Sequence, residues 1–183
     1  MSEPDLENTE ADESEEDYRD KSPSAGRMGK AVEYLVASAC ILASRGELNA
    51  ATSLVDDEGV DLVFNRRGSS ATLAVQVKSR MSDSKRVRAG SFVAFVRSQT
   101  FRPRPDLDLL FVAVDIVEAR LMAAWLVPSE DFAAQAGTPN SRGRLRFYAS
   151  LKPGSRDRWH RYRLTPAELA PRVLQRLAER GDS

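Results

Sequence analysis

The chain has little of what builds disulfides and soft-metal sites. Cys40 is its one cysteine and His160 its one histidine among 183 residues. A disulfide within the chain is therefore excluded, and a zinc site built from several Cys and His ligands is out of reach. No apolar run approaches the roughly 18 residues that a membrane-spanning helix needs, and the acidic N-terminus is unlike a secretory signal. We therefore expect a cytoplasmic protein that does not enter a membrane.

Net charge is also absent, but the two signs are unevenly distributed. Residues 1–26 hold ten acidic and two basic side chains, which leaves 17 acidic and 25 basic side chains in residues 27–183, out of 27 of each sign. The acidic leader, residues 1–26, has almost no large apolar side chain to offset the entropy lost on ordering, so we expect it to be disordered. The remainder, 27–183, has the length of one domain. Its basic balance suits a polyanionic partner, although a solvated Arg-rich surface would have the same composition.

Hydrophobic periodicity predicts an α+β fold, a mixed β-sheet core flanked by an N-terminal and a C-terminal helix. The first helix is expected over residues 28–44, with Cys40 on its packed face. Thr165 and Glu168 form a capping box that opens the last helix, which ends near Arg180. Ser129 is expected to cap a short helix through residue 135. Short runs of β-type residues lie between the helices, at 51–55, 60–65, 72–78, 91–97, 109–117, 121–127 and 144–149.

Two of these runs, 60–65 and 72–78, bring polar side chains to one patch. If they pair as an antiparallel hairpin that turns near Gly68, the numbers of paired residues sum to about 135 or 137. Both registers place Asp61 on the face that carries Gln76 and Lys78. Glu33 lies on the first helix and reaches this patch if the helix packs there. In the alternative, Glu33 faces solvent beside Lys30 near the helix start, where the helix dipole favours a carboxylate.

These residue types suit the hydrolysis of a phosphodiester, which needs a divalent cation on oxygen ligands, an activated water and positive charge near the transition state. Asp61, the Gln76 amide oxygen and the main-chain carbonyl of Val77 would bind the cation. Lys78 would orient or deprotonate the water and neutralise charge. Glu33 would hold cation-bound water or a second ion. Oxygen ligands favour Mg²⁺ or Mn²⁺.

The same pattern resembles a known family. Glu33 on a helix, Asp61 after a turn, and Gln76-Val77-Lys78 on the next strand are similar to the PD-(D/E)XK nuclease superfamily, which includes restriction endonucleases, archaeal-type Holliday junction resolvases and Mrr-like enzymes that cut modified DNA. The resemblance covers about residues 28–100. It implies a restriction-endonuclease-like fold and a catalytic, metal-binding role for these residues. Gln76 departs from the commoner Glu, resembles the Mrr-like branch, and argues against two tightly bound metals.

Basic clusters accompany the candidate site and predict contacts to a phosphate backbone. Lys30 lies near the start of the first helix, where a phosphate of the substrate would be bound. Trp159 and Tyr162 interleave with arginines and would stack on bases or on neighbouring side chains. Arg142, Arg144 and Arg146 alternate and share one strand face. The residues expected to contact DNA are Lys30, Arg80, Lys85, Arg86, Arg88, Arg158 and Arg161.

The sequence therefore predicts a Mg²⁺-dependent or Mn²⁺-dependent endonuclease that acts on DNA in restriction, defence or repair. A first alternative is a catalytically silent DNA-binding or regulatory subunit with the same fold. A second is an interaction protein whose acidic leader docks on a basic partner. His160 is expected to be a surface residue and not a catalytic base. The sequence leaves the oligomeric state open, a homodimer included.

Overall fold

The computed structural model describes residues 22–53 and 59–181. The predicted disorder of residues 1–21 lies outside these ranges, whereas residues 23–26, expected in the leader, form the first turn of a helix. The elements are α2 (Pro23–Ala43), β1 (Leu48–Thr52), β2 (Leu62–Arg66), β3 (Thr72–Met81), α3 (Lys85–Arg88), β4 (Ser91–Arg97), β5 (Leu107–Asp115), β6 (Arg120–Pro128), α4 (Ser129–Gln135), β7 (Arg144–Ser150), η1 (His160–Tyr162), β8 (Arg163–Leu164) and α5 (Pro166–Gly181).

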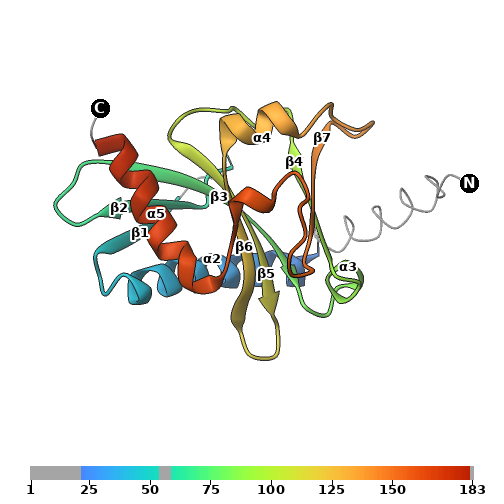
Figure 1. Ribbon diagram of the computed structural model, residues 1–183, viewed down its shortest axis with the longest axis horizontal. Coiled ribbons are helices and arrows are strands. Elements are labelled where there is room, and N and C mark those ends of the chain that lie inside the picture. The colour runs from blue at the N-terminus through green and yellow to red at the C-terminus, as the bar shows by residue number, and fades with distance from the viewer. Residues whose placement is uncertain (1–21, 54–58, 182–183) are drawn as a thin grey trace, which may run out of the picture.

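Within the described ranges the strands form a large sheet and a small one (Figure 1). The large sheet has six strands in the order β1-β2-β3-β5-β6-β8, and all neighbours are antiparallel except β3 and β5. The small sheet is the antiparallel pair β4 and β7. The parallel connection from β3 to β5 passes through α3 and β4. The predicted α+β fold, a mixed sheet flanked by an N-terminal and a C-terminal helix, is confirmed.

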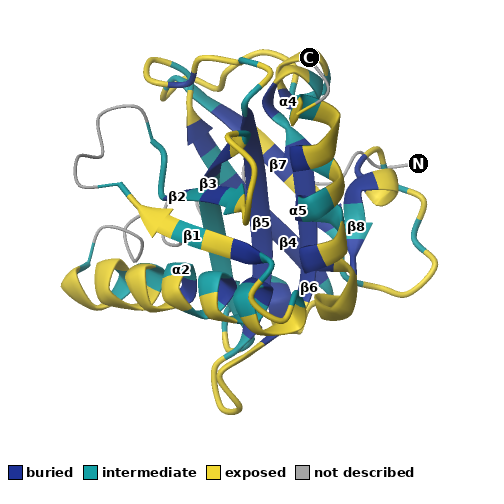
Figure 2. Cartoon of the chain, turned by 90° about the vertical axis from the view of Figure 1, so that its left-hand side faces the viewer, coloured by how far each residue is buried: buried dark blue, intermediate teal, exposed yellow. Residues whose placement is uncertain are grey.

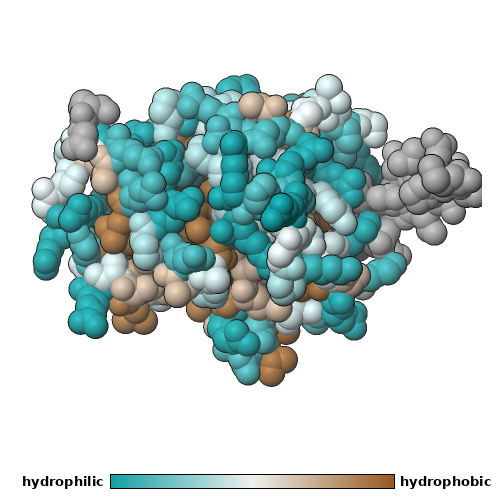
Figure 3. Space-filling model, in the orientation of Figure 1, coloured by the Kyte–Doolittle hydropathy of each residue, from teal (hydrophilic) through white to brown (hydrophobic). Residues whose placement is uncertain are grey.

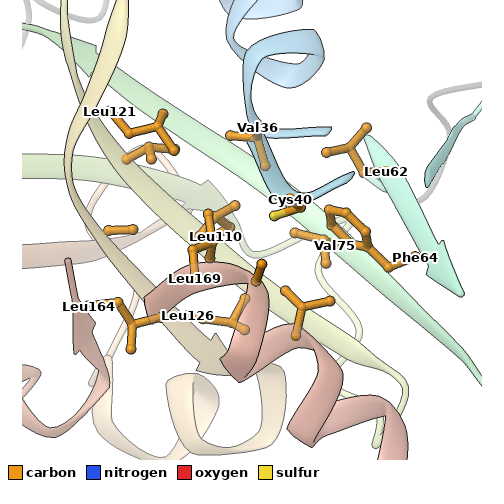
Figure 4. Packing of buried hydrophobic residues seen from close by; sticks show 14 of the residues in the cluster. Val36, Cys40, Leu62, Phe64, Val75, Leu110, Leu121, Leu126, Leu164 and Leu169 are labelled. Atoms are coloured by element: carbon orange, nitrogen blue, oxygen red, sulfur yellow. The ribbon is translucent and has the colours of Figure 1, made fainter. Parts of the chain in front are cut away.

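One face of the large sheet is covered by α2 and α5, which run in different directions and have exposed outer surfaces (Figure 2). Val32, Val36 and Cys40 follow one another at four-residue spacing, so α2 buries a single stripe of side chains. This stripe packs against Leu62 and Val75 of the hairpin (Figure 4). Cys40 lies in this interior as expected, and burial raises the pKa of its thiol to about 12.

The other face of the large sheet packs against β4 and β7 through an aromatic core. Phe111 of β5 stacks on Phe147 of β7 with ring centroids 3.7 Å apart. Trp159 packs against Phe147 at 5.0 Å and is 1% exposed, and Tyr162 is 6% exposed. The expectation that these two residues stack on bases is therefore wrong, because their rings fill the core; stacking on neighbouring side chains is what the structure shows.

Several predicted boundaries differ from the structure for local reasons. The first helix begins at Pro23 and not at Met28, because Ser22 is its N-cap and accepts a hydrogen bond from the N–H of Ala25. Ser129 is not an N-cap: it is buried, and its hydroxyl bonds both the N–H and the carbonyl of Arg104. The predicted capping box is present, since Glu168 accepts from the N–H of Thr165 at 2.7 Å.

The surface is mostly hydrophilic, with apolar side chains at the lower protrusion in Figure 3. That protrusion is the β5–β6 hairpin, where Val117 is 88% exposed. Among residues 22–53 and 59–181, no helix has the length and apolar composition to span a bilayer.

Candidate functional site

Asp61 lies where the β2–β3 hairpin becomes irregular. Leu62 pairs with Val75, a register that sums to 137 and confirms one of the two predicted registers. The N–H of Asp61 also donates to the carbonyl of Val75, at 3.0 Å. This hydrogen bond departs from the regular ladder, which ends at Leu62. Asp61 lies just outside the regular pairing, so its placement on the face of Gln76 stays a prediction.

The side chain of Asp61 forms a hydrogen bond with the main chain of β3. Its Oδ2 accepts a hydrogen bond from the N–H of Val77 at 2.6 Å. Val77 stands between Gln76 and Lys78, so the carboxylate is fixed against the backbone of the Gln-X-Lys element. A short hydrogen bond from a main-chain donor fixes the position of the carboxylate.

Gln76 and Lys78 lie on the face of the large sheet that β4 and β7 cover. Val75 belongs to the core beneath α2, and alternation along β3 turns Gln76 and Lys78 to the opposite face. Both are half-buried. Gly59, with a positive φ of 72°, lies directly against the Gln76 side chain. A Cβ on Gly59 would clash with the Gln76 amide nitrogen and lie 3.2 Å from its amide carbon, so this glycine leaves the space that Gln76 occupies.

Helix α2 carries two further candidate residues, Lys30 and Glu33, and Lys30 interacts with the charge of Asp61. Lys30 Nζ lies 2.6 Å from Glu33 Oε2, and the Glu33 side chain is only 13% exposed. The hydrogen bond to Glu33 is the main cause that raises the pKa of Lys30, and the charge of Asp61 adds to it from farther away. Glu33 thus pairs with Lys30, as the alternative held, but it does not face open solvent. Lys30 lies well inside α2 and not at its start, so the predicted binding of a phosphate by a helix start at Lys30 is wrong.

The donor types of Asp61 and Gln76 suit one hard cation. Asp61 and Gln76 offer a carboxylate and an amide oxygen, which are ligand types for Mg²⁺ or Mn²⁺. Among the described residues no cluster of three or more His, Cys, Asp or Glu side chains could hold a metal ion. Glu33 would have to leave Lys30 to act as a ligand.

The predicted basic residues fall into two structural groups. In the first group, Arg80 is the second-last residue of β3. Lys85, Arg86 and Arg88 belong to the short helix α3, where the sequence indicated a loop. Arg158 and Arg161, by contrast, are tied to α4. Arg158 donates to the carbonyl of Gln135 at 2.7 Å, and Arg161 contacts the Tyr162 hydroxyl and lies 3.9 Å from Asp131. His160 is exposed, as expected.

Two residues near the site or the basic surface have contacts that the sequence did not predict. The role of Gly59 is visible only in the tertiary structure, through its contact with the Gln76 side chain. In the sequence, a glycine just before a strand indicates only a backbone position where φ can be positive. Arg97 pairs in register with Arg144, which joins two basic segments that are distant in sequence. No local sequence signal predicts that pairing.

No protein-family model matches the chain, and no curated protein matches it significantly. Among solved structures, the chain is similar to a bacterial homing endonuclease, I-Ssp6803I, with a TM-score of 0.49 and 23% identity over 80% of this chain and 91% of that chain. The likeness is too distant to identify a function, which has to come from the chain's own residues.

Proposed function

We propose that the chain is a divalent-metal-dependent endonuclease of the PD-(D/E)XK type that cleaves DNA phosphodiester bonds. The observation that carries this proposal is the hydrogen bond from the Val77 N–H to the Asp61 carboxylate. It fixes an acidic group against the backbone between Gln76 and Lys78, as the resemblance to that superfamily requires. The restriction-endonuclease-like fold is part of the same proposal.

Each side chain has a distinct task in this proposal. Asp61 and the Gln76 amide oxygen hold a Mg²⁺ or Mn²⁺ ion, which supplies positive charge to the scissile phosphate when bound. Lys78 orients the attacking water and neutralises charge that develops on the phosphate oxygens. Glu33 accepts a hydrogen bond from a water in the site once the Lys30 ammonium turns to the substrate phosphate. Lys30 thereby changes partner from a carboxylate to the DNA backbone.

The charge of the chain supports DNA as the partner. Residues 27–183 carry 25 basic and 17 acidic side chains, a balance of +8. Arg80 and the α3 residues Lys85, Arg86 and Arg88 follow the site directly in the chain and suit the phosphate backbone on either side of the cleaved bond. Arg158 and Arg161 contribute a more distant contact, because part of their hydrogen-bonding capacity is used within the protein.

A second function is favoured by one observation. The site offers a neutral Gln76 and no cluster of three potential metal ligands within the described residues, which would also suit a DNA-binding or regulatory subunit without catalysis. Incubation of the purified protein with supercoiled plasmid, branched DNA and single strands, each with Mg²⁺, Mn²⁺ or a chelator, separates the two. We expect metal-dependent nicking. Salt-sensitive binding without cleavage under all three conditions would identify the silent subunit instead.

A further inference from the structure

We infer that the outer face of the β4–β7 sheet is the element that reads duplex DNA, by entering its major groove. This inference rests on the proposed function, which supplies DNA as the partner, and it adds the kind of nucleic acid, the groove and the residues that contact bases. The residues of this reading face are Arg97 of β4 and Arg144, Arg146 and Tyr148 of β7.

The face is defined by alternation against a buried counterpart. Phe92, Ala94 and Val96 of β4 belong to the aromatic core, as do Leu145, Phe147 and Ala149 of β7. The intervening residues therefore point away from the large sheet. Among them Ser91 and Val93 are buried, so the accessible part of this face is the Arg97 end of β4 with Arg144, Arg146 and Tyr148 of β7. Arg97 pairs with Arg144, Phe95 with Arg146 and Val93 with Tyr148. The arginines therefore gather at the end of this two-stranded ribbon where β4 ends and β7 begins, called the open end below. Arg97 and Arg146 are exposed, and Tyr148 is 46% exposed.

The ribbon is rigid before any partner binds. Its inner face is anchored by the stack of Phe147 on Phe111. At the open end, both the N–H and the hydroxyl of Ser98 donate to the carbonyl of Gly143, at 3.0 and 2.8 Å. Asn140 Oδ1 accepts from the N–H groups of Arg142 and Arg144, each at 3.0 Å. A preorganised loop loses little entropy on binding, which favours a recognition role.

The dimensions of the ribbon match B-form DNA. Residues two apart on one strand are separated by about 6.8 Å, since an antiparallel strand rises about 3.4 Å per residue. That spacing is close to two base-pair steps of about 3.4 Å each. A two-stranded ribbon fits the major groove, which is about 12 Å wide, and an arginine fork binds guanine O6 and N7 there. The guanidinium of Arg146 already lies 5.2 Å from the centre of the Tyr148 ring, which limits its conformations.

The position of the ribbon is compatible with the candidate site. The β4–β7 sheet covers the same face of the large sheet to which Gln76 and Lys78 point. Helix α3, with Lys85, Arg86 and Arg88, directly precedes β4, and the Ser91 hydroxyl of β4 donates to the carbonyl of Arg86. The basic helix thus lies at the Ser91 end of the ribbon and the arginines lie at its Arg97 end, so a duplex that runs along the ribbon contacts both. Duplex RNA cannot use the ribbon in this way, because its major groove is deep and too narrow.

The test measures binding in chelator, so that cleavage does not interfere. Fluorescence anisotropy compares duplex DNA with duplex RNA of the same sequence for the parent and for Arg144→Ala, Arg146→Ala and Arg146→Lys. Arg67→Ala on the exposed β2–β3 turn is the matched control, since it removes one surface arginine away from the ribbon. Each protein is also used to select from a random-sequence duplex pool, and circular dichroism confirms that each variant is folded.

We expect the parent to prefer duplex DNA, the alanine variants to bind roughly tenfold or more weakly, and Arg67→Ala to bind like the parent. Arg146→Lys keeps the charge but loses the planar fork, so it should relax the selected sequence at one position more than it weakens binding. Equal affinity of the parent for duplex RNA, or unchanged affinity and unchanged selected sequences in the ribbon variants, would overturn the inference.

The cleavage assay separates this inference from the proposed function. If the parent nicks plasmid with Mg²⁺ and the ribbon variants bind and select as the parent does, the ribbon inference alone fails. If the parent never nicks DNA while the ribbon variants lose affinity, the proposed catalysis fails and the reading face stands.

Discussion

The Asp61 carboxylate accepts a hydrogen bond from the main-chain N–H of Val77, with Oδ2 and N separated by 2.6 Å. This contact spans the two strands of the hairpin at the point where their regular pairing ends at Leu62. It gives Asp61 two tasks, a structural one in the hairpin and a chemical one in the proposed site. Substitutions that separate the two tasks are therefore informative.

Asp61→Asn should separate them, because an asparagine oxygen still accepts from the Val77 N–H but carries no charge. We expect Asp61→Asn to melt within a few degrees of the parent and to lose nearly all metal-dependent cleavage. Asp61→Ala should lose cleavage and also about 1 to 3 kcal/mol of stability, because a partly buried N–H is left without its acceptor. Thermal unfolding and plasmid nicking measure the two effects. Full activity in Asp61→Asn would contradict the assigned role.

Lys78→Ala should abolish cleavage while changing DNA affinity no more than a few-fold, because Lys78 acts on the water and the scissile phosphate and not on the flanking backbone. Anisotropy in chelator gives the affinity and plasmid nicking gives the rate. Arg67→Ala, an exposed cation away from the site, is the control for a general loss of positive charge. Cleavage by Lys78→Ala at the parent's rate, under the same metal, would show that the site is wrong.

Gln76→Glu should keep cleavage or raise it, and should lower the Mg²⁺ concentration needed for half-maximal rate, since a carboxylate binds a hard cation better than an amide. A titration of nicking rate against Mg²⁺ measures this. Gln76→Leu removes the oxygen at similar size and should reduce the rate at every Mg²⁺ concentration. A Gln76→Leu variant with the parent's Mg²⁺ dependence would exclude Gln76 as a ligand.

Gly59→Ala should reduce both stability and cleavage, because the added methyl group meets the Gln76 side chain and Gly59 has a positive φ. Gly68→Ala on the β2–β3 turn is the matched control, since Gly68 has a φ of 77° but no atom within 4 Å of the new Cβ. Backbone strain alone costs about 1 to 2 kcal/mol in either variant. The additional loss of stability and of cleavage rate in Gly59→Ala, measured by chemical denaturation and by plasmid nicking, reports the displacement of Gln76. Equal behaviour of the two variants would refute that link.

Removing residues 1–21 should tighten DNA binding at low salt. This segment holds all ten acidic residues of the leader, and its removal leaves α2 complete from its N-cap Ser22. Carboxylates tethered to a basic body compete with phosphates at a high effective concentration, and salt screens both interactions. Anisotropy titrations of both forms over a salt series should show a gain that shrinks as salt rises. If the full chain and the truncated form bind DNA with the same affinity at every salt concentration, the leader affects solubility only.

The sequence by itself determined the elements whose pattern is local. The helical spacing of apolar side chains predicted the first helix with Cys40 on its packed face, and alternation with a turn near Gly68 limited the hairpin to registers that include the observed one. These features were predictable because helices and hairpins are specified by side-chain periodicity and turn residues within a few positions.

Tertiary structure alone decided the features that depend on distant partners. Trp159 and Tyr162 looked like surface aromatics among arginines, yet their rings fill the core between the two sheets. Ser129 looked like a helix cap, yet it bonds the backbone of Arg104. Arg97 meets Arg144 only because β4 pairs with β7 across the aromatic core. Such contacts depend on how shapes and volumes pack between layers, and short-range sequence patterns carry no information about that packing.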